Sequence, residues 1–284
     1  MLDSVDHVII AVEDLDEASK NYEMILGNPP VWKGEHKEFG TKNTLFNFQN
    51  TYLELLAAEG EGIGADLIKH TLEVNGEGLS GIVFKTPDMN RFRNHIQEKG
   101  YYLADVSAGQ GESFETNKKR AWVNQFLPPE LSRGLFSFII EHTQGELPEI
   151  SEYKSSEIQR LDHIVINTND ADGFIKIYRD VFGIPLSLDK FIKHWKKRML
   201  FFRLNKTTIE VVEEIDNTDS NDSLWGLAWG VDDIAAFKDR LISNNIHTSE
   251  IKKGLKNNTL VLTIKDQTHG VPTLIIENQT KKAQ

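Results

Sequence analysis

The sequence contains no cysteine among its 284 residues, no long apolar run and no excess of basic residues. The absence of cysteine excludes disulfides, thiolate nucleophiles and cysteine-based zinc or iron–sulfur sites. A net charge of −11 argues against a nucleic-acid partner, because phosphate contacts need clustered Lys and Arg. Neither a basic and apolar leader nor an apolar run long enough to span a bilayer is present, so we expect a cytoplasmic protein without a membrane partner.

A repeated segment organises the chain. Residues 5–10 (VDHVII) match residues 161–166 (LDHIVI), and each segment leads into an acidic turn. Glu54 lies 47 positions after His7, and Glu210 lies 47 positions after His163. Because both pairs recur at the same offset of 156 residues, we interpret the sequence as a duplicated half.

Each half also contains a weaker internal repeat of one strand, one helix and three further strands. Helical patterns cover residues 15–26, 89–99, 171–182 and 234–244, and a glycine follows the first three. Closing strands are expected at residues 135–141 and 273–277. The sequence therefore predicts an α+β fold of four βαβββ modules, with an N-terminal domain at 1–145, a linker at 146–157 and a C-terminal domain at 158–284.

A strand with Asp-His, a helix ending in Gly and a strand with Leu-Glu-Leu resemble the vicinal oxygen chelate superfamily. This superfamily includes glyoxalase I, extradiol dioxygenases, methylmalonyl-CoA epimerase, and fosfomycin and bleomycin resistance proteins. Residues 36–43 (HKEFGTKN) and 52–56 (YLELL) resemble its glyoxalase-like subgroup. The resemblance implies modules paired into two half-barrel cups, with helices outside. It also implies a divalent metal ion (Zn, Fe, Ni, Mn or Co) on each concave floor, held by the first and last strands of the modules.

Carried onto this sequence, the resemblance implies His7, Glu54 and Glu141 as metal ligands in the first half. The partner module has Gly81 where the relatives carry a fourth ligand. The same count in the second half gives a secondary candidate site of His163, Glu210 and Glu277, with Gly226 at the position without a donor. A single nitrogen ligand weakens the case for a ring-cleaving dioxygenase, which uses two His and one carboxylate.

Each of these residues also has a structural interpretation. His7 alternates with Ile9 on one strand face and fits a hydrogen-bonded cavity residue without metal. Glu54 stands among leucines, where a carboxylate is costly unless it pairs with a cation or a metal. Glu141 is near a strand end, where water can solvate it. Apolar neighbours should raise the pKa of Glu54, which makes this carboxylate the candidate catalytic base.

His36, Asn43 and Arg120 are candidate substrate-binding residues. His36 and Asn43 lie in the subgroup pattern, with a loop or edge-strand role as the alternative. Arg120 precedes a probable strand and could receive a substrate carboxylate through two hydrogen bonds, with a surface position as the alternative. The Gly-rich segment 60–64 (GEGIG) lacks the glycine spacing of a dinucleotide loop and fits a connection between modules.

These features favour a metal-dependent enzyme acting on a small oxygen-rich molecule, with a lyase or isomerase reaction. The substrate would chelate the metal through two adjacent oxygens, and the metal would stabilise the resulting anion. The alternative is a protein that binds or sequesters a small molecule without chemistry, as bleomycin-resistance proteins do. The loss of donors at Gly81 and Gly226 favours this alternative. A homodimer is left open.

Overall fold

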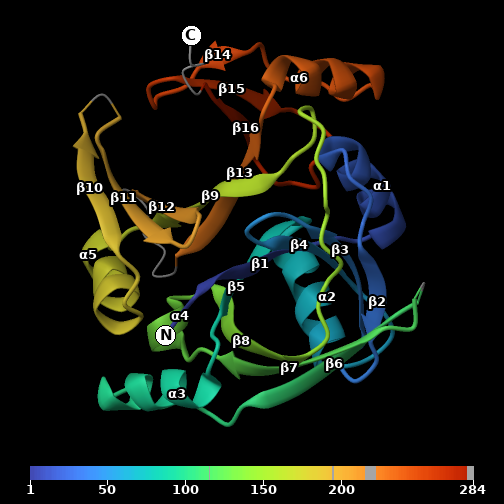
Figure 1. The fold of residues 1–284 in the computed structure, drawn as a ribbon. Helices are drawn as coiled ribbons and strands as arrows, with labels where there is room; N and C mark the ends of the chain where they lie inside the picture. The colour runs from blue at the N-terminus through green and yellow to red at the C-terminus, as the bar shows by residue number, and fades with distance from the viewer. Residues whose placement is uncertain (115, 194, 215–221, 280–284) are drawn as a thin grey trace.

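The computed structural model describes residues 1–114, 116–193, 195–214 and 222–279, and its first eight strands close into a barrel (Figure 1). Around the barrel the strands follow the order β1-β4-β3-β2-β6-β7-β8-β5. The elements of this half are β1 (Ser4–Ala11), α1 (Leu15–Leu26), β2 (Trp32–His36), β3 (Thr41–Asn47), β4 (Tyr52–Ala58), α2 (Ile63–Asn75), β5 (Gly78–Lys85), α3 (Met89–Glu98), β6 (Ser107–Ser113), β7 (Lys119–Phe126), α4 (Pro129–Ser132) and β8 (Phe136–Gln144).

The second half forms an eight-stranded sheet that stays open, in the order β10-β11-β12-β9-β13-β16-β15-β14. Strands β10 and β14 are its two edges. Its elements are β9 (Arg160–Thr168), α5 (Ala171–Ile175), η1 (Lys176–Val181), β10 (Leu186–Ile192), β11 (Lys197–Leu204), β12 (Thr207–Glu213), β13 (Ser223–Val231), α6 (Ile234–Ser243), β14 (Lys252–Lys253), β15 (Thr259–Ile264) and β16 (Thr273–Asn278). Within the described ranges, no helix has the length and apolar character needed to cross a membrane.

The element order confirms an α+β fold of four βαβββ modules, two in the barrel and two in the open sheet. The predicted helix boundaries at residues 15–26 hold: Asp14 caps the first turn of α1, and Gly27 ends it with a φ of 85°. The helix predicted at 171–182 is present as α5 followed by the π-helical turn η1. The cups differ, since only the first one closes.

A β-bulge occurs at the same place in the first strand of every module. In β1 the extra, unpaired residue is Asp6, and in β5 it is Ser80. In β9 and β13 the extra residues are Asp162 and Trp225. A bulge lets two consecutive side chains lie on the same side of a strand and bends the strand locally. The four bulges therefore mark equivalent positions, and the residues that follow them are His7, Gly81, His163 and Gly226.

Strand pairing extends this equivalence to the closing strands. His7 pairs with Tyr52 and Ile9 with Glu54 across the parallel strands β1 and β4. In the partner module, Gly81 pairs with Phe136 and Val83 with Phe138. The counterpart of Glu54 is therefore Phe138. In the second half Glu210 pairs with Val165, two residues after His163. Ala228, two residues after Gly226, pairs with Leu274, so Leu274 is the counterpart of Glu210.

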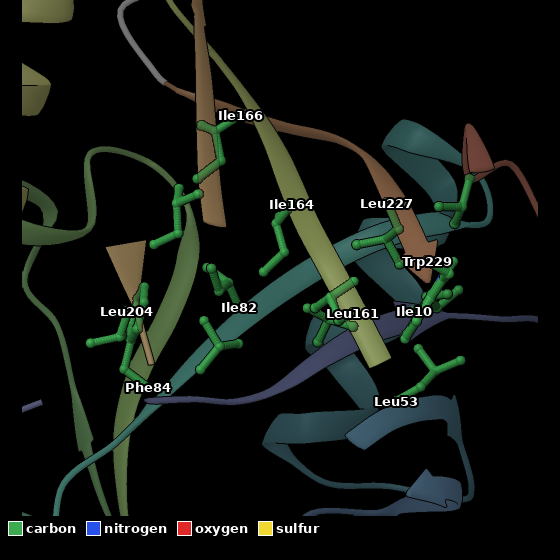
Figure 2. Close-up of a cluster of buried hydrophobic side chains, with 14 of the residues drawn as sticks. Ile10, Leu53, Ile82, Phe84, Leu161, Ile164, Ile166, Leu204, Leu227 and Trp229 are labelled. Atoms are coloured by element: carbon green, nitrogen blue, oxygen red, sulfur yellow. The ribbon is translucent and has the colours of Figure 1, made fainter. Parts of the chain in front are cut away.

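One hydrophobic core joins the two halves (Figure 2). Ile10 and Phe84 of the barrel belong to the same buried cluster as Ile164 and Trp229 of the open sheet. Alternation along β1 sends Val8 and Ile10 into this shared core, whereas Ile9 and Ala11 belong to a separate cluster inside the barrel. The strand thus has one face for folding and one face for the lumen, as its sequence predicted.

Polar contacts also connect the halves. The side chain of Asn50 accepts a hydrogen bond from the backbone of Leu161 at 3.0 Å and donates to Thr207 at 2.8 Å. The last barrel strand ends at Gln144 and β9 begins at Arg160, so the predicted linker at 146–157 lies between them. The division into two independent domains stays a prediction.

Candidate functional site in the closed barrel

The barrel encloses a cavity of about 520 Å³, within the range of small-molecule sites. Helix α2 lies over the lumen, inside the ring of strands in Figure 1, and contributes Leu67 and Ile68 to its wall. Most of the wall is apolar, and a smaller group of polar side chains occupies one part of it. The lining residues with polar side chains are His7, His36, Thr41, Asn43, Tyr52, Glu54, Ser107, Arg120, Trp122 and Asn124.

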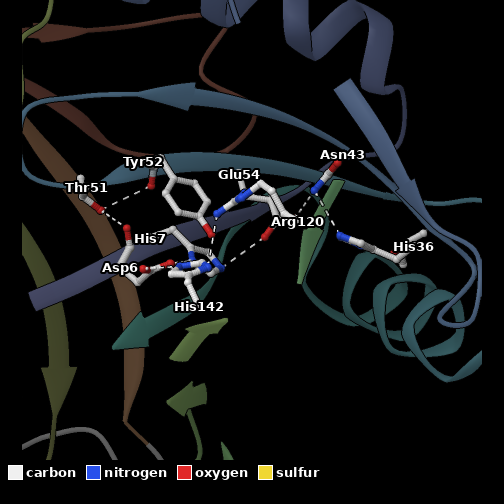
Figure 3. Close-up of polar contacts among 10 residues, drawn as sticks. Asp6, His7, His36, Asn43, Thr51, Tyr52, Glu54, Arg120 and His142 are labelled. Carbon is white, nitrogen blue, oxygen red and sulfur yellow. Dashed lines mark hydrogen bonds and ion pairs between the residues drawn. The ribbon is translucent and has the colours of Figure 1, made fainter. Parts of the chain in front are cut away.

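His7 and Glu54 meet inside this cavity (Figure 3). Nε2 of His7 lies 3.3 Å from Oε2 of Glu54, and both side chains are buried. On the other side of the ring, Nδ1 of His7 donates to Oδ1 of Asp6 at 2.7 Å. Because Asp6 is the bulged residue of β1, its carboxylate can reach the ring of its own neighbour. The imidazole is thereby fixed with Nε2 toward the cavity and Glu54.

Charge and burial set the protonation of this group. Burial disfavours the imidazolium of His7, but hydrogen bonds to Asp6 and Glu54 outweigh burial and raise its pKa above 6.5. Burial likewise disfavours the carboxylate of Glu54, yet the hydrogen bond and charge of His7 lower its pKa. The pKa of Asp6 falls well below its usual range, since two histidines outweigh its burial. The expected upward shift for Glu54 is therefore wrong, because its partner is a buried imidazole.

Asn43 and His36 continue the polar group beyond Glu54. Asn43 Nδ2 donates to Glu54 Oε1 at 2.7 Å and lies 3.4 Å from Nε2 of His36. Nδ1 of His36 donates to Thr41 Oγ1 at 3.0 Å. Burial lowers the pKa of His36, and the nearby Arg120 and His7 add to this effect. The structure thus brings the predicted residues His36 and Asn43 to the cavity, with His36 in its neutral form.

Arg120 also faces the cavity and is only 6% exposed, so the surface interpretation is wrong. Its guanidinium carbon lies 5.8 Å from the ring centre of Trp32 and 5.5 Å from that of Tyr52. The Tyr52 ring in turn stacks on His7 with a centroid distance of 4.5 Å. One ring therefore connects the arginine to the His7–Glu54 pair.

Three buried polar atoms around the cavity have no protein partner. They are Oδ1 of Asn43, Nε of Arg120 and Oδ1 of Asn124, out of five such atoms in the described residues. An unsatisfied buried donor or acceptor typically costs about 1–3 kcal/mol. Their concentration in one cavity indicates a site that a polar ligand completes.

Glu141 does not join this group. Its Oε2 accepts a 2.6 Å hydrogen bond from the backbone of Met89, the first residue of α3, outside the barrel. Glu277 accepts from Ile234 at the start of α6, and Glu213 accepts from Ala171 at the start of α5. These three glutamates stabilise helix N-termini. In the strand register, Glu141 and Glu277 are equivalent to Glu213, which lies three residues beyond Glu210. The structure therefore contradicts the placement of Glu141 and Glu277 as metal ligands.

The residues present do not fit a resident metal ion. His7 and Glu54 are two donors, while the equivalent positions of the partner module hold Gly81 and Phe138, which offer none. Over the part of the chain that the structure describes, no three His, Asp or Glu side chains lie close enough to hold an ion. A stable protein site normally supplies three or four ligands. The geometry thus indicates a hydrogen-bonded pair of His7 and Glu54 in a largely apolar cavity.

The secondary candidate site is a looser copy. Nε2 of His163 lies 3.7 Å from Oε2 of Glu210, and Nδ1 lies 3.1 Å from Asp162. The side chains of His163 and Glu210 are 16% and 19% exposed, because the second sheet does not close around them. Burial raises the pKa of Glu210 here, and His163 compensates only in part. The structure brings His163 and Glu210 together and leaves Glu277 apart.

Sequence reasoning missed two members of the site, Asp6 and His142. Asp6 Oδ2 accepts a 2.8 Å hydrogen bond from Nε2 of His142, while its Oδ1 holds His7. The recurrence of Asp before both His7 and His163 was a usable signal for Asp6. His142 had none, since a bulge in the pairing of β7 with β8 decides which side it faces.

Comparisons with known proteins agree with the fold. The family model described as "Glyoxalase-like domain" matches residues 5–182. The model described as "Glyoxalase/Bleomycin resistance protein/Dioxygenase superfamily" matches residues 160–271. No curated protein matches the sequence.

Several solved structures share the fold along almost the whole chain. A glyoxalase with bound Mn(II) from Novosphingobium aromaticivorans has a TM-score of 0.65 and 16% identity, covering 99% of this chain and 84% of its own. A 4-hydroxymandelate synthase variant from Streptomyces coelicolor has a TM-score of 0.62 and 14% identity, covering 100% and 94%. A hypothetical protein from Staphylococcus aureus has a TM-score of 0.66 and 12% identity, covering 97% and 99%. At these identities the likeness concerns the fold alone.

Proposed function

The chain belongs to the glyoxalase-like domain family, and from that premise we propose that its barrel binds a small, mostly apolar molecule and moves a proton on it. The cavity would receive the apolar body, and the polar group around Glu54 would receive a carbonyl or hydroxyl end. The observation that carries this proposal is the contact of 3.3 Å between His7 and Glu54 inside the largely apolar cavity of the closed barrel.

The two residues have complementary roles in such a reaction. The lowered pKa of Glu54 keeps it as a carboxylate at neutral pH, so it can accept a proton from a carbon next to a carbonyl group. Hydrogen bonds to Asp6 and Glu54 raise the pKa of His7 and so favour its imidazolium form, whose Nε2–H can donate to the carbonyl oxygen as negative charge develops there. Asp6 holds His7 in this orientation, and Asn43 holds the second oxygen of Glu54. This chemistry is that of an isomerase or lyase, and no step is assigned to a metal ion.

The apolar partner module favours a second candidate function, binding without chemistry. Gly81 offers no side chain and Phe138 contributes an aromatic ring to the cavity wall in place of a donor, which suits sequestration of an apolar compound. The two functions share the cavity and differ in whether Glu54 reacts. Both predict that a neutral apolar dye such as N-phenyl-1-naphthylamine binds the barrel.

Exchange of carbon-bound hydrogen for deuterium separates them. A panel of ketones and 2-oxo acids would be incubated with the protein in D₂O and followed by proton NMR. Proton transfer predicts exchange next to the carbonyl in the wild type, its loss in Glu54→Gln, and its retention in the matched variant Glu210→Gln. Binding of the panel without any exchange would leave sequestration as the function. Absence of both dye binding and exchange would contradict the proposed site altogether.

A further inference from the structure

Arg120 is a buried cation without a carboxylate partner. Among the described residues, no Asp or Glu oxygen lies within 4.0 Å of its guanidinium, and its Nε has no hydrogen-bond acceptor. Its polar neighbours are the Tyr52 hydroxyl and Nδ1 of His142, which lies 3.5 Å away. Arg133, by contrast, is paired with Asp222 at 2.6 Å. Burying a charge without a counter-ion is costly, so the protein maintains Arg120 at the expense of stability.

The surroundings hold this side chain in a fixed position. It lies over the faces of Trp32 and Tyr52, which bind a cation through their rings. The chain passes close to it at Gly145, where a Cβ would come within 3.2 Å of Arg120 Cγ. Gly145 has a φ of 74°, so glycine suits both the backbone and the close approach. The guanidinium is therefore pre-organised while one of its donors remains free.

Resting on the proposed function, we infer that the natural ligand is an apolar molecule with a single carboxylate, which Arg120 binds at the cavity wall. A planar guanidinium matches a carboxylate through paired hydrogen bonds. The carboxylates of Asp6 and Glu54 pair with His7 and not with Arg120, so the guanidinium offers one uncompensated charge, which favours a monoanion over a phosphate dianion. The apolar remainder of the cavity accommodates the hydrocarbon part. The Tyr52 ring, in contact with both Arg120 and His7, places the carboxylate beside the proton-transfer pair.

The experiment compares acids with their neutral amides. Octanoate and 4-phenylbutanoate would be titrated against octanamide and 4-phenylbutanamide by calorimetry, in the wild type and in Arg120→Met. We expect the wild type to bind an acid at least about tenfold more tightly than its amide, since only the acid forms charge-assisted hydrogen bonds with the guanidinium. Arg120→Met should abolish this preference. The control is Arg91→Met, at an exposed position of helix α3, and this variant should keep the preference for the acid.

A stability measurement separates a binding role from a structural one. If Arg120 awaits a ligand, the ligand-free Arg120→Met variant should have a Tm equal to that of the wild type or about 2–4 °C higher. A Tm several degrees lower would overturn the inference, because the guanidinium would then be satisfied by the protein itself. Equal binding of acid and amide, or no binding of the acids, would also overturn it. Dye binding and deuterium exchange, measured in the same preparations, test the proposed function separately from the role of Arg120. If both persist while the preference for acids is absent, the inference about Arg120 fails and the proposed function stands.

Discussion

Asp6 and His7 are consecutive residues whose side chains are hydrogen-bonded to each other, with 2.7 Å between Oδ1 and Nδ1. Consecutive side chains of a regular strand point to opposite faces. The bulge in β1 removes this alternation at one position and places a carboxylate behind the ring. Asp6 thereby supports the histidine that faces Glu54, and it connects that histidine to His142 on β8.

We predict that Asp6→Asn destabilises the protein by about 3 kcal/mol at pH 7, because it leaves the buried His7 and the half-buried His142 without their anionic partner. The pKa of Asp6 is lowered in the folded state, so its contribution is complete above its unfolded pKa near 3.8 and is lost as the pH falls further. The difference between variant and wild type should therefore shrink below about pH 4. Urea unfolding at several pH values measures this dependence.

Asp162→Asn is the matched control. Asp162 occupies the equivalent bulge, but its side chain is 24% exposed and lies 3.1 Å from His163. Solvent screening should limit its effect to about 1 kcal/mol or less. Equal destabilisation by the two substitutions would contradict the special role assigned to the closed barrel.

The glutamates at the helix N-termini give a second prediction. Glu141→Ala and Glu277→Ala remove the acceptors for Met89 and Ile234, and each should cost about 1 kcal/mol of unfolding free energy. Neither should alter dye binding in the barrel, because both carboxylates lie outside it. If Glu141→Ala changed binding while leaving stability intact, Glu141 would have to belong to the site after all.

The register of the strands predicts where a metal site could be restored. Gly81→His together with Phe138→Glu would place a second imidazole and carboxylate at the positions equivalent to His7 and Glu54. A Cβ at Gly81 would come within 3.0 Å of Ile9 Cδ1 and of the Phe136 ring and within 3.1 Å of Ile9 Cβ, so the added side chain requires both residues to repack. We expect Co(II) to bind this double variant at least about tenfold more tightly than the wild type and to raise its Tm.

The single variants Gly81→His and Phe138→Glu serve as controls for that experiment. Each adds one donor, so each should bind Co(II) more weakly than the double variant. Visible absorption of bound Co(II) reports the coordination directly. A double variant no better than either single one would show that the two modules are not related as the bulges indicate.

The fold was largely predictable because its signals are local and repeated. The paired positions of His7 and His163, with glutamates at equal offsets, were enough to predict duplicated modules. The residue equivalent to Glu54 on the closing strand of each partner module was harder to predict. No sequence pattern around Glu141 or Glu277 shows which strand position faces the site. Only the pairing register shows that Phe138 and Leu274 are the equivalent residues. A shift of a few residues along a strand changes which face a side chain occupies.

Local sequence patterns also predicted part of the candidate site. His7, His36, Asn43, Glu54 and Arg120 all line the cavity, and each belongs to a segment with a recognisable pattern or an unusual charge. The direction of the pKa shift of Glu54 could not follow from its leucine neighbours, because the decisive partner is 47 residues away in sequence. Contacts between distant strands set the electrostatics of the site.

The open edges of the second sheet leave a row of unused backbone donors and acceptors on β10 and on β14. Such edges recruit strands from other molecules and promote aggregation unless they are protected. Here β14 consists of Lys252 and Lys253 alone, and β10 carries Asp189 and Lys190 in its centre. Two copies that paired along β14 would bring their lysines together, and this repulsion disfavours strand addition at that edge.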